Sequence, residues 1–289
     1  MVQQESTVSR LRRRLAEVVD GLASLAADVP IQRYNPRERD PVLVPPYLWG
    51  DMSPQQRAAQ IALKRTYDPV AELLRLHLSK APKDLVRQFD NADQEFRRWL
   101  EMQQRWDLSP NSAVNENALR SAAAALDQIL AVLEVTGHSE VMVVPDTNSL
   151  LASPDPSVYR SIAAQGRMVF MLLPTVLGEL DHLKIEHRNP DLRDKAKNAI
   201  SRIKGWRHQG SLATGVTVES SITVKACHSE PDMKRTLSWL DADVKDDRII
   251  ASIIALQAEH PSARVILVTG DINLQNKADA ALIETAEVP

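Results

Sequence analysis

Four carboxylates in the second half of the chain stand where apolar runs give way to polar residues. Asp146 follows the run VMVVP, and Asp271 follows ARVILVTG. Glu179 lies in the first turns of a helix predicted within PTVLGELDHL, and Asp247 opens the amphipathic stretch DRIIASIIAL. Each position taken alone has a structural explanation, because a helix dipole stabilises an acid in the first turn and an aspartate after a strand commonly caps a turn.

Taken together, these acids predict a chemistry. Carboxylates gathered in one cleft repel one another unless a cation neutralises them. Oxygen ligands from aspartate and glutamate, completed by water, suit Mg²⁺ or Mn²⁺. Two such ions about 4 Å apart can clamp the attacking and leaving oxygens of a phosphodiester displacement. Since a metal-activated water attacks directly, no serine or cysteine nucleophile is required.

The elements that must position these acids alternate between strand and helix. Near-continuous apolar strands are predicted at VMVVP, RMVFMLLP and ARVILVT, with helical stretches between them. GVTVESSITVKA is β-like and holds one strand or two, and NLQNKADAALIETAEV gives a short helix and an edge strand. This alternation is typical of a parallel sheet covered on both faces, whose ligand site lies beyond the carboxyl ends of the strands. We therefore expect residues 138–289 to form an α/β domain.

Residues 1–137 have a different pattern and predict an all-helical domain. Apolar residues recur with a helical period in STVSRLRRRLAEVVDGLASLAADV, VAELLRLHL, LVRQFDNADQEFRRWLEMQQRW and ENALRSAAAALDQILAVLEVTG, and Gly137 closes the last of these. Between the first two lies a proline-rich segment at 30–54. We interpret it as an extended or irregular loop wrapped over the helices, with a partner-binding strap as the alternative.

Composition narrows the class of protein. The 289 residues are 44% hydrophobic and 25% charged, with a net charge of −3, which is typical of a soluble globular protein. No apolar run reaches the ~18 residues of a membrane span, and the N-terminal segment lacks the apolar region of a signal peptide. The single cysteine, Cys227, excludes a disulfide framework and is interpreted as a buried or half-buried thiol in a strand. We expect a cytoplasmic protein in which any nucleic-acid contact is local, because there is no overall basic excess.

The ordered set of motifs in the second half resembles the PIN-domain nucleases. It comprises VVPDTN at 143–148, PTVLGELDHL at 174–183, DDRIIA at 246–251 and VTGDINL at 268–274, and the resemblance covers roughly residues 140–285. It implies a Rossmann-like parallel sheet and Mg²⁺- or Mn²⁺-dependent cleavage of single-stranded RNA. The positions that match the motif acids, and so the implied catalytic and metal-binding residues, are Asp146, Glu179, Asp247 and Asp271. Asn148 and Thr269 correspond to supporting polar groups, and Asp243 and Asp246 to outer carboxylates.

A basic helix predicted at PDLRDKAKNAISRIKGWRHQ offers contacts for RNA phosphates. Its candidate contacts include Arg193, Lys197 and Lys204, which would contribute the salt-dependent part of binding. Trp206 is interpreted as a core residue, with stacking on a base as the alternative.

Two other readings of the acids stay open. A haloacid-dehalogenase-type phosphatase also places an aspartate after its first strand, but its general acid two residues later is replaced here by Asn148, and Glu179 would have no role. The second alternative is a catalytically silent PIN-like domain that binds RNA or docks a protein. For the helical half, four roles stay open: substrate recognition, covering of the cleft, binding of a protein partner and homo-oligomerisation.

Overall fold

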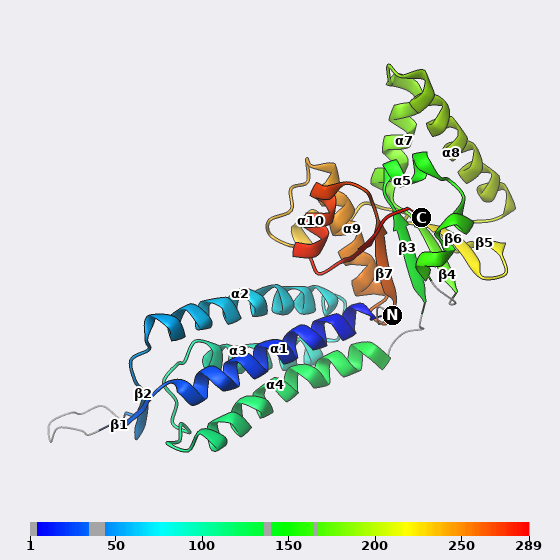
Figure 1. Cartoon of the computed structure of the whole chain (residues 1–289). Coiled ribbons are helices and arrows are strands. Elements are labelled where there is room, and N and C mark those ends of the chain that lie inside the picture. The colour runs from blue at the N-terminus through cyan, green and yellow to red at the C-terminus, as the bar shows by residue number, and fades with distance from the viewer. Residues whose placement is uncertain (1–4, 35–43, 136–139, 164–166, 289) are drawn as a thin grey trace. The chain divides into compact units, whose positions relative to one another are not determined.

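The computed structural model describes residues 5–34, 44–135, 140–163 and 167–288. The chain divides into two compact units, one comprising Ser9–Leu133 and the other Glu134–Pro289 together with Met1–Val8. Figure 1 labels most of the helices and strands of both units. In the described part of the chain, no helix has the length and apolarity needed to cross a bilayer.

The first unit is helical, as predicted. Its described residues form α1 (Thr7–Asp28), α2 (Pro54–His77), α3 (Lys83–Leu100) and α4 (Ser112–Val135). The apolar faces of these helices bury large aromatic side chains, among which Tyr67, Phe89, Phe96 and Trp99 are at most 1% exposed. The rings of Tyr67 and Phe96 pack with their centroids 4.8 Å apart. Burial of these apolar surfaces is the main stabilising contribution to the unit.

Helix α2 begins earlier than the stretch VAELLRLHL predicts. The side chains of Ser53 and Gln56 form a capping box, in which each accepts a hydrogen bond from the backbone N–H of the other. Pro54 occupies the first turn, where its missing N–H costs no hydrogen bond. The helix then continues through Pro69. The polar first half of α2 therefore lacks the apolar periodicity on which the prediction depended.

Helix α3 ends earlier than predicted, at Leu100 rather than at Trp106. The chain reverses at Met102, whose φ of 50° is in the left-handed region that a side chain with a Cβ seldom adopts. The Met102 side chain is buried, which offsets the cost of that conformation. The predicted closure of the fourth helix by Gly137 lies outside the described residues.

The proline-rich segment is partly a small sheet, which among the described residues of this unit departs from an all-helical description. Strand β1 (Ile31–Arg33) pairs antiparallel with β2 (Tyr47–Trp49). Trp49 is 8% exposed and meets Trp99 edge to face, with centroids 6.4 Å apart. The segment thus packs on the helices through an aromatic anchor, as the loop interpretation predicts. Residues 35–43 lie outside the described part of the chain.

The second unit is built on a six-stranded mixed sheet. Its strands are β3 (Val141–Pro145), β4 (Met168–Leu172), β5 (Val216–Glu219), β6 (Ile222–Ala226), β7 (Arg264–Val268) and β8 (Glu284–Ala286). Their spatial order is β5-β6-β4-β3-β7-β8, and every neighbouring pair is parallel except β5 and β6. All residues of the two strands β3 and β4 are buried, as near-continuous apolar strands require.

Helices connect these strands and cover the sheet. They are α5 (Thr147–Ala152), α6 (Arg160–Ala163), α7 (Pro174–Glu186), α8 (Pro190–Gln209), α9 (Lys245–Glu259) and α10 (Ile272–Ala280), with the short 3₁₀ helices η1 (Pro156–Tyr159) and η2 (Met233–Arg235). Helix α7 packs along α8, and α9 contacts both α10 and α7. Helices α7, α8 and α9 and the strands fall where the apolar pattern predicts them, so the expected α/β fold is confirmed.

The stretch GVTVESSITVKA forms two strands rather than one. Strands β5 and β6 make a hairpin at the sheet edge, with an irregularity between Thr217 and Glu219. The preceding Gly215 has a φ of 108°, and a Cβ there would lie 2.8 Å from Thr223 Cγ2, so the turn into β5 requires glycine. At the opposite edge, β8 pairs with β7 after the short helix α10, as predicted.

Candidate active site

The strand order of the sheet reverses between β3 and β7. These strands lie side by side and parallel, with Val143 opposite Ile266. After β3 the chain continues to β4 on one side, and after β7 it continues to β8 on the other. In open α/β sheets such a divergence leaves a crevice beyond the carboxyl ends of the two strands, and ligands bind there. Asp146 and Asp271 follow these two strand ends.

Asp146 is a buried carboxylate that is held at both oxygens. It is 4% exposed and caps helix α5, because its Oδ1 accepts a hydrogen bond from Ser149 N at 2.6 Å. Its Oδ2 accepts a hydrogen bond from the Thr269 hydroxyl, also at 2.6 Å. Burial raises the pKa of the nearby Tyr159 phenol, and the negative charge of Asp146 adds to that rise. The charge of Asp146 is thus fixed in place at the end of β3.

Thr269 links the two strand-end aspartates. It is fully buried, and its hydroxyl accepts a hydrogen bond from Asp271 N at 3.0 Å while donating to Asp146. Asp271 itself is exposed and caps helix α10 through the backbone N–H groups of Asn273 and Leu274. One buried hydroxyl therefore fixes the spacing between the end of β3 and the start of α10.

Glu179 projects from helix α7 with 23% of its side chain exposed. One carboxylate oxygen accepts a short hydrogen bond from the hydroxyl of Thr147, the residue that follows Asp146. The other oxygen lies 3.1 Å from the ammonium group of Lys245, at the start of α9. Glu179 is thus tied both to the turn after β3 and to the helix that carries Asp247.

Asp247 is the most enclosed acid of helix α9, with 7% of its side chain exposed. Its Oδ2 accepts a hydrogen bond from the backbone N–H of Asp241 at 2.9 Å. Its buried Oδ1 lies 2.7 Å from Lys277 Nζ in α10 and forms an ion pair with it. The angles of this contact do not meet hydrogen-bond geometry. A cation therefore stands beside this carboxylate from the neighbouring helix.

The electrostatics of Asp246 indicate that three of the four acids, Glu179, Asp247 and Asp271, lie near it. Its pKa is raised, chiefly by burial, and the negative charges of Asp271, Asp247 and Glu179 raise it further. The positive charge of Lys277, whose Nζ lies 3.7 Å from the Asp246 carboxylate, opposes that rise. The cluster is therefore strongly negative, and its lysines compensate only part of that charge.

The donor set fits a hard divalent cation in its chemistry. All the acids offer carboxylate oxygens, and the Oδ1 of Asp247 is a buried acceptor whose partner is an ammonium ion. Across residues 5–34, 44–135, 140–163 and 167–288, no three histidine, cysteine, aspartate or glutamate side chains lie close enough together to hold a metal ion. The carboxylates would therefore have to draw together around an ion.

Other predicted site residues are not drawn into this cluster. Asn148 is exposed on the first turn of α5. On α8, Arg193 donates a hydrogen bond to the carbonyl of His187, and Lys197 pairs with Asp194 on the same helix. Lys204 is exposed on the same helix.

Trp206 and Cys227 serve the core rather than the acids. Trp206 is 6% exposed and meets Phe170 of β4 edge to face, so the core interpretation is confirmed and the ring does not offer a face for a base. Cys227 follows β6 directly instead of lying within it, and its N–H donates to Leu172 O. The thiol is half-buried, and burial raises its pKa to about 11.

The structure adds residues that the sequence did not single out. They are Thr147, which donates to Glu179, Ser149, whose hydroxyl donates to Val268 O, and the two lysines that pair with the acids, Lys245 and Lys277. The sequence shows that Thr147 follows Asp146, but it does not show that the Thr147 hydroxyl bonds to Glu179 on another helix. The lysines carried no signal, because a charged side chain on a helix is ordinarily solvated.

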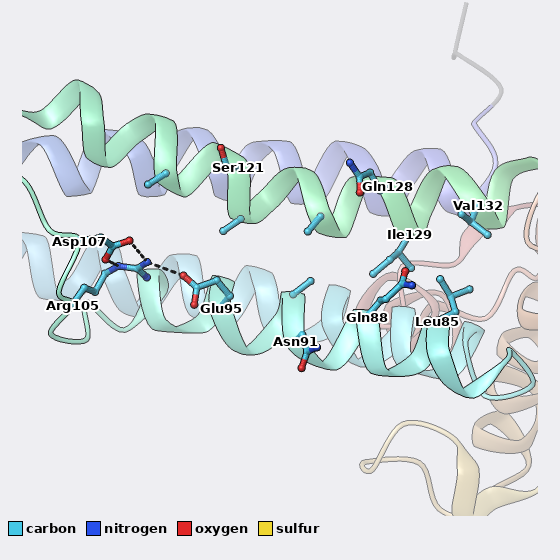
Figure 2. Close-up of a pocket in the computed structure, with 14 residues that line it drawn as sticks. Leu85, Gln88, Asn91, Glu95, Arg105, Asp107, Ser121, Gln128, Ile129 and Val132 are labelled. Carbon is cyan, nitrogen blue, oxygen red and sulfur yellow. Dashed lines mark hydrogen bonds and ion pairs between the residues drawn. The ribbon is translucent and has the colours of Figure 1, made fainter.

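The helical unit has a separate groove between α3 and α4 (Figure 2). It has a volume of about 840 Å³ and is lined largely by small, apolar and amide side chains, among them Ala92, Gln88 and Ile129. At one end Arg105 donates hydrogen bonds to Glu95 at 2.7 Å and to Asp107 at 2.9 Å (Figure 2). The charged groups at this end of the groove are thus paired with one another.

Comparison with known proteins bears on the second unit. A family model described as a PIN domain matches residues 143–288, which is half of the 289-residue chain. No curated protein matches the chain. The match covers all four acids, the whole of β7 and the last three residues of β3.

Proposed function

The chain belongs to the PIN-domain family, and we propose that it is a divalent-metal-dependent endoribonuclease that cleaves single-stranded RNA. Proteins of this family are generally nucleases that use divalent metals. The finer elements of the proposal are RNA rather than DNA, Mg²⁺ or Mn²⁺ as the ion, and the cytoplasm as the location.

One observation carries the proposal. The carboxyl ends of the paired strands β3 and β7 are followed by two aspartates, the buried and doubly hydrogen-bonded Asp146 and the exposed Asp271. Helices α7 and α9 bring Glu179 and Asp247 to the same negative cluster. A non-catalytic sheet edge gains no stability from concentrating negative charge in this way.

Asp146, Glu179, Asp247 and Asp271 would hold the metal. When bound, the cation lowers the pKa of water and offsets negative charge on the phosphate. The chain's own contribution is to preorganise the carboxylates. Thr269 locks Asp146, Thr147 orients Glu179, and the backbone N–H of Asp241 orients Asp247. Asn148 and Asp246 are proposed as outer groups that bind water or the substrate backbone.

Helix α8 is the proposed electrostatic contact for the RNA backbone. Its basic residues include Arg193, Lys197 and Lys204, and the last two are exposed. Since each phosphate contact releases counterions, neutralising these side chains should reduce the salt dependence of RNA binding. The measurement is the affinity of the full chain for single-stranded RNA over a series of salt concentrations.

A catalytically silent domain is the second candidate. The observation that favours it is that Lys245 and Lys277 already stand beside Glu179 and Asp247. Ammonium groups that stayed there would compete with a metal ion for the same oxygens. A domain of this kind would bind RNA or a protein without cutting it.

The test is a cleavage assay with the full chain on unstructured RNA, with single-stranded DNA and duplex RNA of the same sequence as comparisons. Mg²⁺ and Mn²⁺ are supplied separately, and EDTA provides the metal-free control. The variant Asp146→Asn removes one charge from the cluster, and Asp279→Asn removes one charge from an exposed position on α10 as a matched control.

We expect the wild type and Asp279→Asn to cleave RNA equally, and Asp146→Asn to lose activity by a factor of about 100 or more. EDTA should abolish all cleavage. If the folded wild type binds RNA but cuts none of the substrates with either ion, the silent domain replaces the nuclease. Cleavage that survives EDTA would contradict the metal requirement.

A further inference from the structure

The segment that precedes helix α9 carries an exposed tryptophan. Trp239 is 45% exposed, whereas Trp49, Trp99 and Trp206 are at most 8% exposed. The fifth tryptophan, Trp106, belongs to the helical unit and is 61% exposed. Throughout the described residues, no aromatic pair and no cation–π contact involves the ring of Trp239. The ring is therefore available to an outside partner.

The backbone holds Trp239 in this outward position. Leu237 and Leu240, on either side of it, are 2% and 9% exposed and anchor the segment in the core. The N–H of Leu240 donates to the carbonyl of Leu237 at 3.1 Å, which closes a turn around Trp239. An exposed aromatic side chain on a fixed turn loses little further backbone freedom when it binds a partner.

The same segment is attached to the acid cluster. Two residues after Trp239, the backbone N–H of Asp241 donates to Asp247 Oδ2 at 2.9 Å. The carbonyl of Asp241 then accepts a hydrogen bond from Val244 N at 3.2 Å, immediately before α9 begins. The tryptophan is therefore placed next to the acids by a hydrogen bond to one of them.

A second exposed apolar side chain flanks the cluster from α10. Ile272 is 71% exposed and directly follows Asp271. Helices α9 and α10 are in contact, and the charge of Asp271 acts on Asp246. Apolar groups thus border the negative cluster, Trp239 before α9 and Ile272 on α10. Under the proposed function, divalent cations held by the carboxylates would contact the RNA phosphates, and the apolar groups would contact its bases. Such an arrangement matches a ligand that has both phosphates and unstacked bases.

We propose that Trp239 is a stacking subsite for one nucleobase of a single-stranded substrate and positions the neighbouring phosphate at the acid cluster. This inference rests on the proposed function and adds a residue that selects single strands. Every base has a π-face that stacks on an aromatic ring, and in a duplex those faces are already covered. The subsite therefore favours unpaired RNA without reading its sequence.

The test measures binding separately from cleavage. A fluorescein-labelled oligouridylate dodecamer is titrated with the full chain carrying Asp146→Asn, so that the probe stays intact, and anisotropy gives the dissociation constant. The added variants are Trp239→Leu, Trp239→Phe and, as a matched exposed tryptophan in the other unit, Trp106→Leu. A set of dodecamers with one abasic nucleotide at each position locates the stacked base.

Trp239→Leu should weaken binding about tenfold, in line with the loss of one base–aromatic stack. Trp239→Phe should keep most of the affinity, and Trp106→Leu should change nothing. At one position, an abasic nucleotide should weaken RNA binding by the protein that keeps Trp239. The same abasic RNA should bind the Trp239→Leu protein as well as the intact RNA does. A purely structural role for the tryptophan would not produce that coupling between one side chain and one nucleotide.

The stacking subsite would be overturned if Trp239→Leu bound RNA with unchanged affinity. It would also be overturned if the proteins with and without Trp239 responded alike to every abasic dodecamer. The ring would then be left as a contact for a protein. Absence of RNA binding by the folded chain would also overturn the subsite. The cleavage assay tests separately whether the protein is a ribonuclease. If Trp239 is coupled to one nucleotide but no RNA is cut, the subsite belongs to a catalytically silent domain. If RNA is cut but no such coupling is found, the protein is a nuclease that lacks this subsite.

Discussion

Lys277 of helix α10 stands beside Asp247 of helix α9, with Nζ 2.7 Å from Oδ1. The carboxylate is 7% exposed, and the same ammonium lies 3.7 Å from Asp246. The nearby carboxylates, Asp247 foremost, raise the pKa of Lys277, so the lysine stays charged. This ion pair neutralises a carboxylate that water barely reaches.

Lys277→Met should therefore destabilise the metal-free protein by about 1–3 kcal/mol, because it leaves a buried carboxylate without its counter-charge. Mn²⁺ should restore more stability to the variant than to the wild type, since ligand binding to the folded state adds stability. The measurement is urea denaturation with EDTA and with Mn²⁺. Lys197→Met, which breaks an exposed pair on α8, is the control, and equal losses in the two variants would contradict the expectation.

Thr269→Val should affect both stability and activity. It keeps the shape of a fully buried side chain but removes the hydroxyl that Asp146 and the N–H of Asp271 both use. A buried carboxylate and a partly buried backbone N–H then lose a partner, and we expect a loss of about 1–3 kcal/mol with weaker RNA cleavage. Denaturation and the cleavage assay measure the two effects. Thr217→Val, at an exposed position on β5, should be neutral, and equal behaviour of both variants would refute the role of Thr269.

His77 should make the stability of the protein depend on pH. Burial lowers its pKa below 6.5, against the opposing effect of its 2.7 Å hydrogen bond with Leu73 O. As pH falls below 6.5, the unfolded chain takes up a proton that the folded chain refuses. The stability present above that pH is therefore lost on acidification, by at most about 1.4 kcal/mol per pH unit from this group.

The comparison that isolates this effect is wild type against His77→Leu in denaturant titrations from about pH 7 to about pH 5. The variant should lose less stability over that interval, whatever its stability at neutral pH. His208→Leu, on the exposed end of α8, should follow the wild type. Parallel pH profiles for wild type and His77→Leu would show that His77 does not titrate differently on folding.

Cys227 should be unreactive in the folded protein. Its pKa of about 11, raised by burial and then by Glu259 and Glu230, leaves very little thiolate at neutral pH. Labelling by a thiol reagent should be at least about tenfold slower in the native protein than in denaturant. Cys227→Ser should cleave RNA at the wild-type rate. Rapid native labelling, or loss of cleavage in the variant, would point to a functional thiol.

The strands, and the aspartates that follow them, were predictable because their signals are local. The buried runs that become β3 and β7 are apolar at every position except Arg264, and each is followed by an aspartate that caps the next helix. Since the carboxyl ends of adjacent parallel strands share an edge, the proximity of Asp146 to Asp271 follows from pattern and topology.

What could not be predicted depends on partners distant in sequence. Glu179 receives its hydrogen bond from Thr147 on another helix, and Lys277 finds Asp247 only because α9 and α10 pack together. The start of α2 was missed for a different reason. Its first turns are polar and are specified by the capping box of Ser53 and Gln56 rather than by apolar periodicity.

The pairing of β3 with β7 has a consequence for biosynthesis. Asp146 and Thr269, which meet at the ends of these strands, are 123 positions apart in the chain. A ribosome therefore completes β3 and β4 well before it supplies the strand and hydroxyl that finish the crevice. Until β7 docks, Asp146 lacks its bond from Thr269 and the acid cluster is incomplete. Under the proposed function, the catalytic site would therefore assemble only when the last part of the chain has been made.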